Sequence, residues 1–221
     1  MVFPPRCRIC KKPSVDIMCL DCLATLPRIS GSICVKCGKP TLREVGECRE
    51  CTGRRLYFSF ARSGGIYAGV LKDAIHELKF KNGKKLAPYL AKFISSAASD
   101  IADDIDLVTF VPLTKRKEAR RGYNQSRLIA EELCLGLSKG LFTGLIKIKE
   151  VPEQNKLGLN ERTRNVKRAF AVSSPVKGKI LLVDDVYTTG STVNECARQL
   201  KKSGASEVFV LTIARTPLTG R

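Results

Sequence analysis

Several common features are absent from this 221-residue sequence. No apolar run is long enough to span a membrane, and the first residues, MVFPPRCRIC, contain no apolar signal region. We therefore expect a soluble, cytoplasmic protein without membrane insertion. No Gly-Lys-Ser/Thr phosphate loop and no G-x-G-x-x-G fingerprint occurs, which argues against a P-loop and against a Rossmann dinucleotide site.

Histidine is nearly absent as well. His76 is the only one, and it lies in a helical pattern beside Lys79 and Lys81. We interpret it as a surface or boundary residue rather than a catalytic base. No other side chain stands out as a dedicated nucleophile.

Cysteine, in contrast, is concentrated at one end of the chain. Eight of the ten cysteines form four C-x-x-C pairs before residue 52, and nothing indicates the oxidising compartment that disulfides need. Each pair is a knuckle that aims two thiolates at one metal ion. Short spacers favour two sequential four-cysteine sites, although a cross-braced pairing is a second arrangement. The expected zinc ligands are Cys7, Cys10, Cys19, Cys22, Cys34, Cys37, Cys48 and Cys51.

Residues 1–55 are therefore predicted to form a double zinc ribbon with two structural Zn²⁺ ions. Such a module binds nucleic acid or protein, or stabilises a segment too small for a core of its own. Residues 56–221 are predicted to form a second domain, and we expect the two parts to have separate stabilising cores.

The charge of the chain is strongly positive. Lysine and arginine number 39 against 21 acidic residues, which gives a formal charge of +18. Eight zinc-bound thiolates subtract eight charges and two Zn²⁺ ions add four, so the corrected charge is +14. This excess favours a polyanionic partner such as diphosphate or nucleic acid, while a lysine-rich solvated surface is the plainer alternative.

After residue 55 the pattern becomes α/β. Strands are expected at 58–67 (or a hairpin around Gly64-Gly65), 107–113, 145–149, 179–183 and 208–214. Helical spacing links Val70 to Leu78, Leu86 to Ala97, and Leu128 to Leu137, the last helix starting near Asn124. Alternating strands and helices predict an α/β fold with a parallel sheet.

Residues 179–192, KILLVDDVYTTGST, are the most informative segment. Four apolar residues predict a buried strand, two carboxylates follow, and a hydroxyl-rich turn leads into a helix. A helix N-terminus at the end of such a strand suits a phosphate, and the carboxylates suit sugar hydroxyls. A ribose with a 5′-phosphate satisfies both. The predicted binding residues are Asp184, Asp185, Thr188, Thr189, Gly190, Ser191 and Thr192.

This segment resembles the signature of phosphoribosyltransferases, which bind phosphoribosyl pyrophosphate. Two more segments resemble the ComF family: VPLTKRKEARRGYNQS at 111–126 and PEQNKLGLNERTRNVKRAF at 152–170. Together with the four C-x-x-C knuckles, they occur in the order that is typical of this family. The resemblance extends along almost the full chain. It implies a type I phosphoribosyltransferase-like sheet flanked by helices, and a role in handling incoming single-stranded DNA during natural competence.

The resemblance also assigns residues to two phosphate-binding segments. A diphosphate loop is expected at Leu113, Thr114, Lys115 and Arg116, and a flexible loop over the site at Arg162, Arg164 and Lys167. Mg²⁺ is expected to bind together with phosphoribosyl pyrophosphate, since it prefers phosphate and hydroxyl oxygens. The alternatives are a basic loop that caps the helix near Asn124 and a nucleic-acid-binding loop at 150–168.

Two functions follow from these expectations. The first is a competence protein that binds phosphoribosyl pyrophosphate and single-stranded DNA. The alternative is an active phosphoribosyltransferase with an unknown amine or base acceptor, acting in nucleotide metabolism without a DNA role. A weaker third idea is that the ribbons dock a helicase or another DNA-uptake protein.

Overall fold

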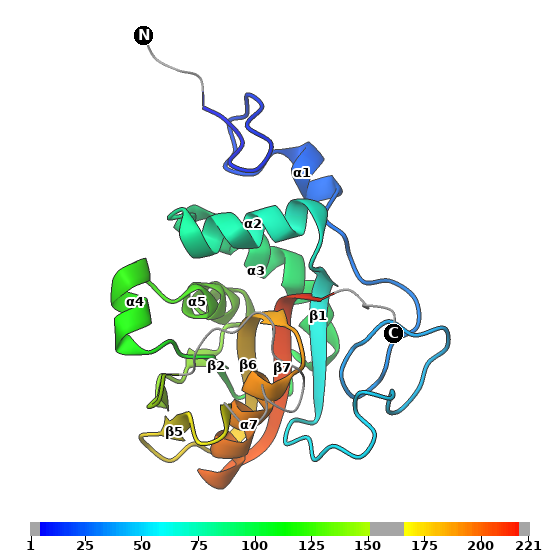
Figure 1. The fold of residues 1–221 in the computed structure, drawn as a ribbon, viewed down its shortest axis with the longest axis vertical. Helices are drawn as coiled ribbons and strands as arrows, with labels where there is room; N and C mark the ends of the chain where they lie inside the picture. The colour runs from blue at the N-terminus through cyan, green and yellow to red at the C-terminus, as the bar shows by residue number, and fades with distance from the viewer. Residues whose placement is uncertain (1–4, 151–165, 217–221) are drawn as a thin grey trace.

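A five-stranded sheet forms the centre of the computed structural model, which describes residues 5–150 and 166–216 (Figure 1). Its strand order is β1-β7-β6-β2-β3, and all neighbouring strands are parallel. A separate antiparallel pair, β4 with β5, lies beside it. The strands are β1 Phe60–Ile66, β2 Leu107–Phe110, β3 Gly140–Leu141, β4 Leu145–Lys147, β5 Phe170–Val172, β6 Gly178–Tyr187 and β7 Ala205–Arg215.

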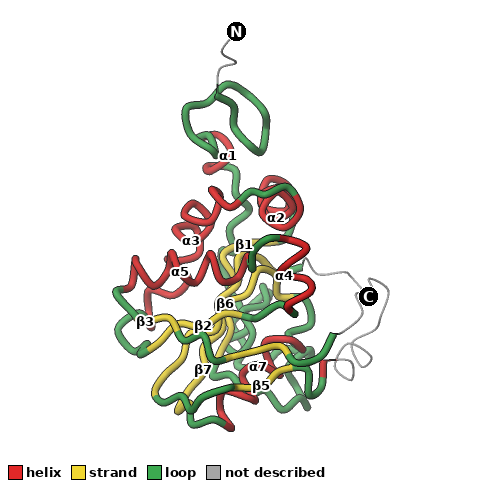
Figure 2. Tube along the Cα trace, turned by 90° about the vertical axis from the view of Figure 1, so that its left-hand side faces the viewer, coloured by secondary structure: helices red, strands yellow, loops and turns green. Residues whose placement is uncertain are grey.

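Helices cover both faces of this sheet, as Figures 1 and 2 show. Helices α3 and α5 pack on one face, and α7 packs on the other together with β5. The α-helices are α1 Leu20–Ala24, α2 Gly69–Phe80, α3 Ala87–Ser95, α4 Lys115–Arg121, α5 Gln125–Leu137 and α7 Ser191–Lys202, and two 3-10 helices span η1 Lys84–Leu86 and η2 Ser96–Ile101.

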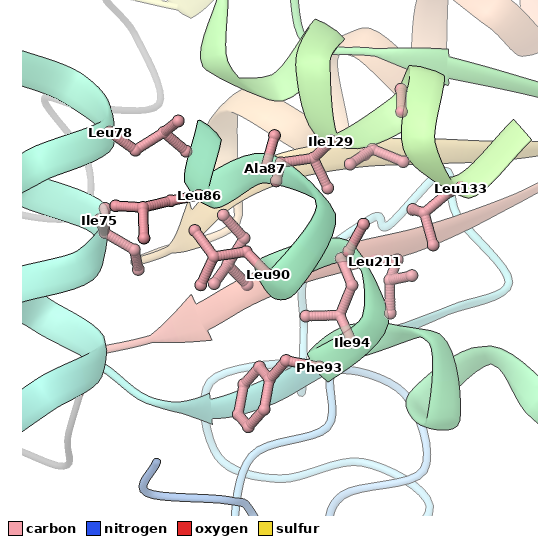
Figure 3. Packing of buried hydrophobic residues seen from close by; sticks show 14 of the residues in the cluster. Ile75, Leu78, Leu86, Ala87, Leu90, Phe93, Ile94, Ile129, Leu133 and Leu211 are labelled. Atoms are coloured by element: carbon pink, nitrogen blue, oxygen red, sulfur yellow. The ribbon is translucent and has the colours of Figure 1, made fainter. Parts of the chain in front are cut away.

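The apolar run in β6 is explained by burial on both faces. Leu181 and Val183 belong to the core on the α3–α5 side, whereas Ile180 and Leu182 belong to the core on the α7 side. Strand residues alternate between faces, so a central parallel strand must be apolar at every position. Figure 3 shows the first of these cores, where side chains of α2, α3 and α5 meet Leu211 of β7.

The ribbon module shares these cores. Cys7, Met18 and Cys22 are buried in the same cluster as α2 and α3. The cysteines of the second ribbon are buried in the same cluster as α7. The expectation of separate stabilising cores is therefore wrong, because each ribbon covers a different side of the sheet domain.

Of the two alternatives for residues 58–67, the single strand is confirmed, and Gly65 lies inside it at a point where a Cβ would come within 2.3 Å of the Pro27 carbonyl oxygen. Two local predictions need correction. The basic segment after β2 is the helix α4 rather than a loop. Strand β6 continues to Tyr187, so the two carboxylates lie within the strand and not after it. Among the described residues, no helix has both the length and the apolarity that a membrane crossing requires.

Candidate functional site

The sheet order places two loops at one edge of the sheet. From β2 the chain proceeds to β3 on one side, and from β6 it proceeds to β7 on the other. The loops that follow β2 and β6 are therefore neighbours, and the amide of Val111 donates to the carbonyl of Val183 at 2.9 Å. In open parallel sheets, ligands bind in the crevice at such a reversal of strand order.

Asp185 is buried at this edge of the sheet, and its two carboxylate oxygens are bonded to two helices. Lys79 of α2 lies 2.9 Å from Oδ1, and Gln125 of α5 donates to Oδ2 at 2.5 Å. Burial disfavours the charge on Lys79, but the neighbouring carboxylate of Asp185 outweighs it and raises the pKa of the ammonium group. Asp185 and Lys79 thus form an internal ion pair.

Asp184 is placed differently. Its Oδ1 accepts from the hydroxyl of Ser126 at 3.0 Å and from the amide of Asp185 at 2.9 Å. Burial, together with the charge of Asp185, raises the pKa of Asp184 to about 7. A cation or a hydroxyl donor that meets this carboxylate would favour its charged form.

The turn between β6 and α7 contains a constrained glycine and several hydroxyl groups. Gly190 has φ +73°, and a Cβ there would come within 2.2 Å of the Tyr187 hydroxyl oxygen, so only glycine fits. The hydroxyls of Thr189 and Ser191 lie 2.9 Å apart, and Thr188 is exposed. Thr192 is half-buried in the first turn of the twelve-residue helix α7.

The second ribbon packs directly against this loop. Arg54 donates to the carbonyl of Thr189 at 3.0 Å. Arg215 is 3% exposed, donates to the carbonyl of Cys37 at 2.7 Å, and lies over the ring of Tyr187, 5.1 Å from its centroid. A chain of contacts therefore leads from a zinc ligand through Arg215 and Tyr187 to Gly190.

The predicted diphosphate segment begins as the N-terminus of α4. The Thr114 hydroxyl accepts from the amide of Lys117 at 3.4 Å and donates to Glu150 at 3.2 Å. Leu113 is half-buried, whereas Lys115 and Arg116 are exposed in the first turn of the helix. Of the predicted flexible loop, Lys167 is exposed just before β5, and Arg162 and Arg164 lie outside the described residues.

The eight predicted zinc ligands gather into two sequential sites. One holds Cys7, Cys10, Cys19 and Cys22, and the other Cys34, Cys37, Cys48 and Cys51.

These two sites fit zinc in both chemistry and spacing. The sulfur–sulfur distances are 3.8 Å for Cys7–Cys22, 3.6 Å for Cys10–Cys19 and 3.7 Å for Cys37–Cys48. A tetrahedral ion with Zn–S bonds of about 2.3 Å needs sulfur atoms about 3.8 Å apart. The sequential pairing is confirmed over the cross-braced one.

Known proteins were compared with the chain. Residues 1–52 match the family described as a double zinc ribbon domain. The chain is 32% identical to DNA utilization protein YhgH of Salmonella typhimurium, over 98% of this chain and 99% of that protein. It is 31% identical to competence protein ComFC of Bacillus subtilis, over 93% of this chain and 86% of that protein. The chain belongs to the ComF family.

Solved structures match this ComF protein more distantly. Adenine phosphoribosyltransferase from Thermoanaerobacter pseudethanolicus has a TM-score of 0.39 and 13% identity, over 62% of this chain and 83% of that one. The sheet and the ribbons themselves confirm the predicted α/β class, a parallel sheet flanked by helices with an N-terminal zinc-ribbon module.

Sequence reasoning missed several residues of the crevice. Gln125 and Ser126, which contact the acid pair, end the segment 111–126 whose resemblance to the ComF family was noted, so a signal for them existed. No sequence signal marked Lys79, because a lysine near the end of an amphipathic helix is usually solvated. Arg54 and Arg215 also gave no signal, since their partners are distant in sequence.

Proposed function

We propose that this ComF protein binds phosphoribosyl pyrophosphate in the crevice between the loops after β2 and β6. The observation that carries the proposal is an acid pair, half-buried Asp184 and buried Asp185, that lies two residues before a glycine-pinned, hydroxyl-rich turn at the N-terminus of α7. Helix N-termini favour phosphate because their amides are unpaired and their dipole end is positive. Carboxylates on the same strand accept hydrogen bonds from ribose hydroxyls.

The two carboxylates have different proposed roles. Asp184 keeps one oxygen that accepts no hydrogen bond from the described residues, so it faces the ribose. Asp185 contributes mainly by position, since both of its oxygens are already bonded to Lys79 and Gln125. Thr188, Thr189, Gly190, Ser191 and Thr192 bind the 5′-phosphate.

The diphosphate group requires further cations. We assign it to the segment Leu113, Thr114, Lys115 and Arg116, with Mg²⁺ bound between diphosphate and ribose oxygens. Arg162, Arg164 and Lys167 are proposed to close over the bound ligand and exclude water.

We also propose that the protein binds single-stranded DNA and acts in DNA uptake in the cytoplasm. Support comes from the excess of basic residues and from relatives named for DNA utilization and competence. A DNA-uptake or helicase protein is a further proposed partner, with the zinc ribbons as the docking surface.

An active phosphoribosyltransferase is the second candidate. The raised pKa of Asp184 supports it, because a carboxyl that titrates near neutrality can exchange a proton during transfer to an amine or base. Incubation with phosphoribosyl pyrophosphate, Mg²⁺ and candidate acceptors separates the two functions. Diphosphate release that depends on an acceptor supports transfer, and its absence with intact binding supports a binding role.

Calorimetric titration with Mg²⁺ and phosphoribosyl pyrophosphate tests the binding proposal. Charge-assisted hydrogen bonds are worth about 1.5–3 kcal/mol, so Asp184→Asn should weaken binding by about 10- to 100-fold. Asp185→Asn should have a smaller effect. The control is Asp73→Asn, an exposed carboxylate on α2. Equal affinities for the wild type, Asp184→Asn and the double variant with Asp185→Asn would show that the sugar binds elsewhere.

A further inference from the structure

A pocket lies between the C-terminal end of α2 and helix α4, and Lys79, the partner of Asp185, is part of its lining. Its volume is about 260 Å³, below the range of about 300–1,000 Å³ that encloses a whole drug-sized ligand. It therefore suits one part of a larger molecule. Its lining residues are Lys79, Phe80, Asn82, Lys117, Arg120, Arg121 and Tyr123.

The chemistry of this pocket combines positive charge with an exposed aromatic ring. Four of its lining residues are lysine or arginine, and no acidic side chain is among the described residues that line it. Phe80 is 63% exposed, so much of its ring is open to solvent. The guanidinium of Arg121 lies 5.4 Å from the Phe80 ring centroid, and the His76 ring lies 4.9 Å away.

The rest of the pocket is held rigidly. Tyr123 is 7% exposed, and its hydroxyl donates to the carbonyl of Leu78. Lys79 is engaged by Asp185, so its ammonium group is already balanced by a carboxylate. Arg120 on α4 is exposed and lines the pocket, so its guanidinium can meet an incoming anion.

We propose that this pocket binds one nucleotide of a single-stranded nucleic acid, with the base stacked on Phe80 and the phosphodiester on Arg120. Positive grooves with aromatic platforms bind single strands in this way, since every base has a face that can stack. A neutral free base would need no cluster of cations. A duplex would keep its bases stacked on one another and leave Phe80 unused.

A nucleic-acid strand bound in this pocket can extend past α2 to further basic residues. A second hollow of about 410 Å³ lies between the first ribbon and α2, and Arg6, Arg8, Lys11 and Lys81 line it. Glu77 also lines this hollow and pairs with three of these cations, so the net positive charge of the hollow is smaller. The α4 pocket is therefore the stronger anchor, and the inference rests on the proposed binding of single-stranded DNA.

Fluorescence anisotropy with an oligothymidylate and an abasic strand of equal length tests this assignment. Stacking on one aromatic ring is worth about 1–3 kcal/mol, so Phe80→Ser should weaken oligothymidylate binding by about 5- to 150-fold. It should leave the abasic strand unaffected, and Phe80→Tyr should restore affinity. Arg120→Gln should weaken both strands and lower the salt slope by about 0.7.

Leu135→Ser is the matched control, because Leu135 is a 78% exposed apolar residue on α5 outside the pocket lining. The assignment is overturned if Phe80→Ser and Leu135→Ser bind oligothymidylate equally, or if Phe80→Ser weakens the abasic strand as much as the natural one. The assignment is also overturned if thymidine monophosphate displaces the strand and binds with the same affinity, because the pocket would then be a mononucleotide site. If the wild type binds neither strand, the proposed DNA function itself fails, whatever the variants show.

Discussion

Replacing Lys79 with methionine isolates the buried ion pair that supports the acidic end of β6. Methionine keeps most of the apolar stem and removes the ammonium group, which lies 2.9 Å from Asp185. The side chains of Lys79 and Asp185 are 20% and 9% exposed, so water cannot replace the lost partner fully. An uncompensated carboxylate is then left inside the protein.

The expected cost follows from that burial. Removal of one member of a buried pair destabilises a protein by about 3–5 kcal/mol. Gln125 still donates to Asp185 at 2.5 Å in the variant, so the lower end of the range applies. We expect Lys79→Met to lower the free energy of unfolding by about 3 kcal/mol.

Urea denaturation of a double-mutant cycle measures this cost. Adding Asp185→Asn to Lys79→Met removes the orphan charge and should restore about 1–3 kcal/mol. Lys81→Met is the control, because this lysine is 56% exposed and its partner Glu77 keeps Arg8 and Lys11. Its effect should stay below about 1 kcal/mol. Equal losses for Lys79→Met and Lys81→Met, or no recovery in the double variant, would refute the reasoning.

Three further predictions concern the crevice and the ribbons. The folded-state pKa of Asp184 is about 7, against an ordinary value of 3.8, so the native state binds a proton that the unfolded state has lost. The free energy of unfolding should therefore fall as pH rises between these values. Denaturation at about pH 5 and at about pH 8 should show a smaller difference in this free energy for Asp184→Asn than for the wild type. Cys37→Ser, which disrupts the second zinc site beside Arg215, should weaken phosphoribosyl pyrophosphate about tenfold or more in calorimetry, whereas Cys10→Ser in the first site should change it less. Gly190→Ala should lower the free energy of unfolding in urea by about 1–3 kcal/mol, because φ +73° and the Tyr187 hydroxyl exclude a Cβ. It should also weaken the binding of phosphoribosyl pyrophosphate. Unchanged affinity would show that the loop does not bind the phosphate.

Features with a strong local cause were predictable from the sequence. The run 180–183 is apolar at every position because β6 is buried on both faces, and this pattern identified the central strand. The spacing of the cysteines likewise predicted both four-cysteine sites. In each case the constraint acts on neighbouring residues.

Features that lack an apolar period, or that depend on distant partners, were not predictable. Helix α4 has the sequence KRKEARR and buries no residue, so it shows no apolar period, and capping by Thr114 with the turn at Gly122 defines it instead. Lys79 and Asp185 are separated by 106 positions, and their pairing requires the sheet to be assembled. The merging of the ribbons with the domain cores depends on the same assembly.

A crystal structure of the protein with phosphoribosyl pyrophosphate and Mg²⁺ would locate the ligand on the sheet. We predict a 5′-phosphate at the Thr188–Thr192 turn and ribose hydroxyls within hydrogen-bond distance of Asp184, with Lys79 still paired to Asp185. Density for the ligand away from the crevice between β2 and β6, with the turn unoccupied, would contradict this prediction.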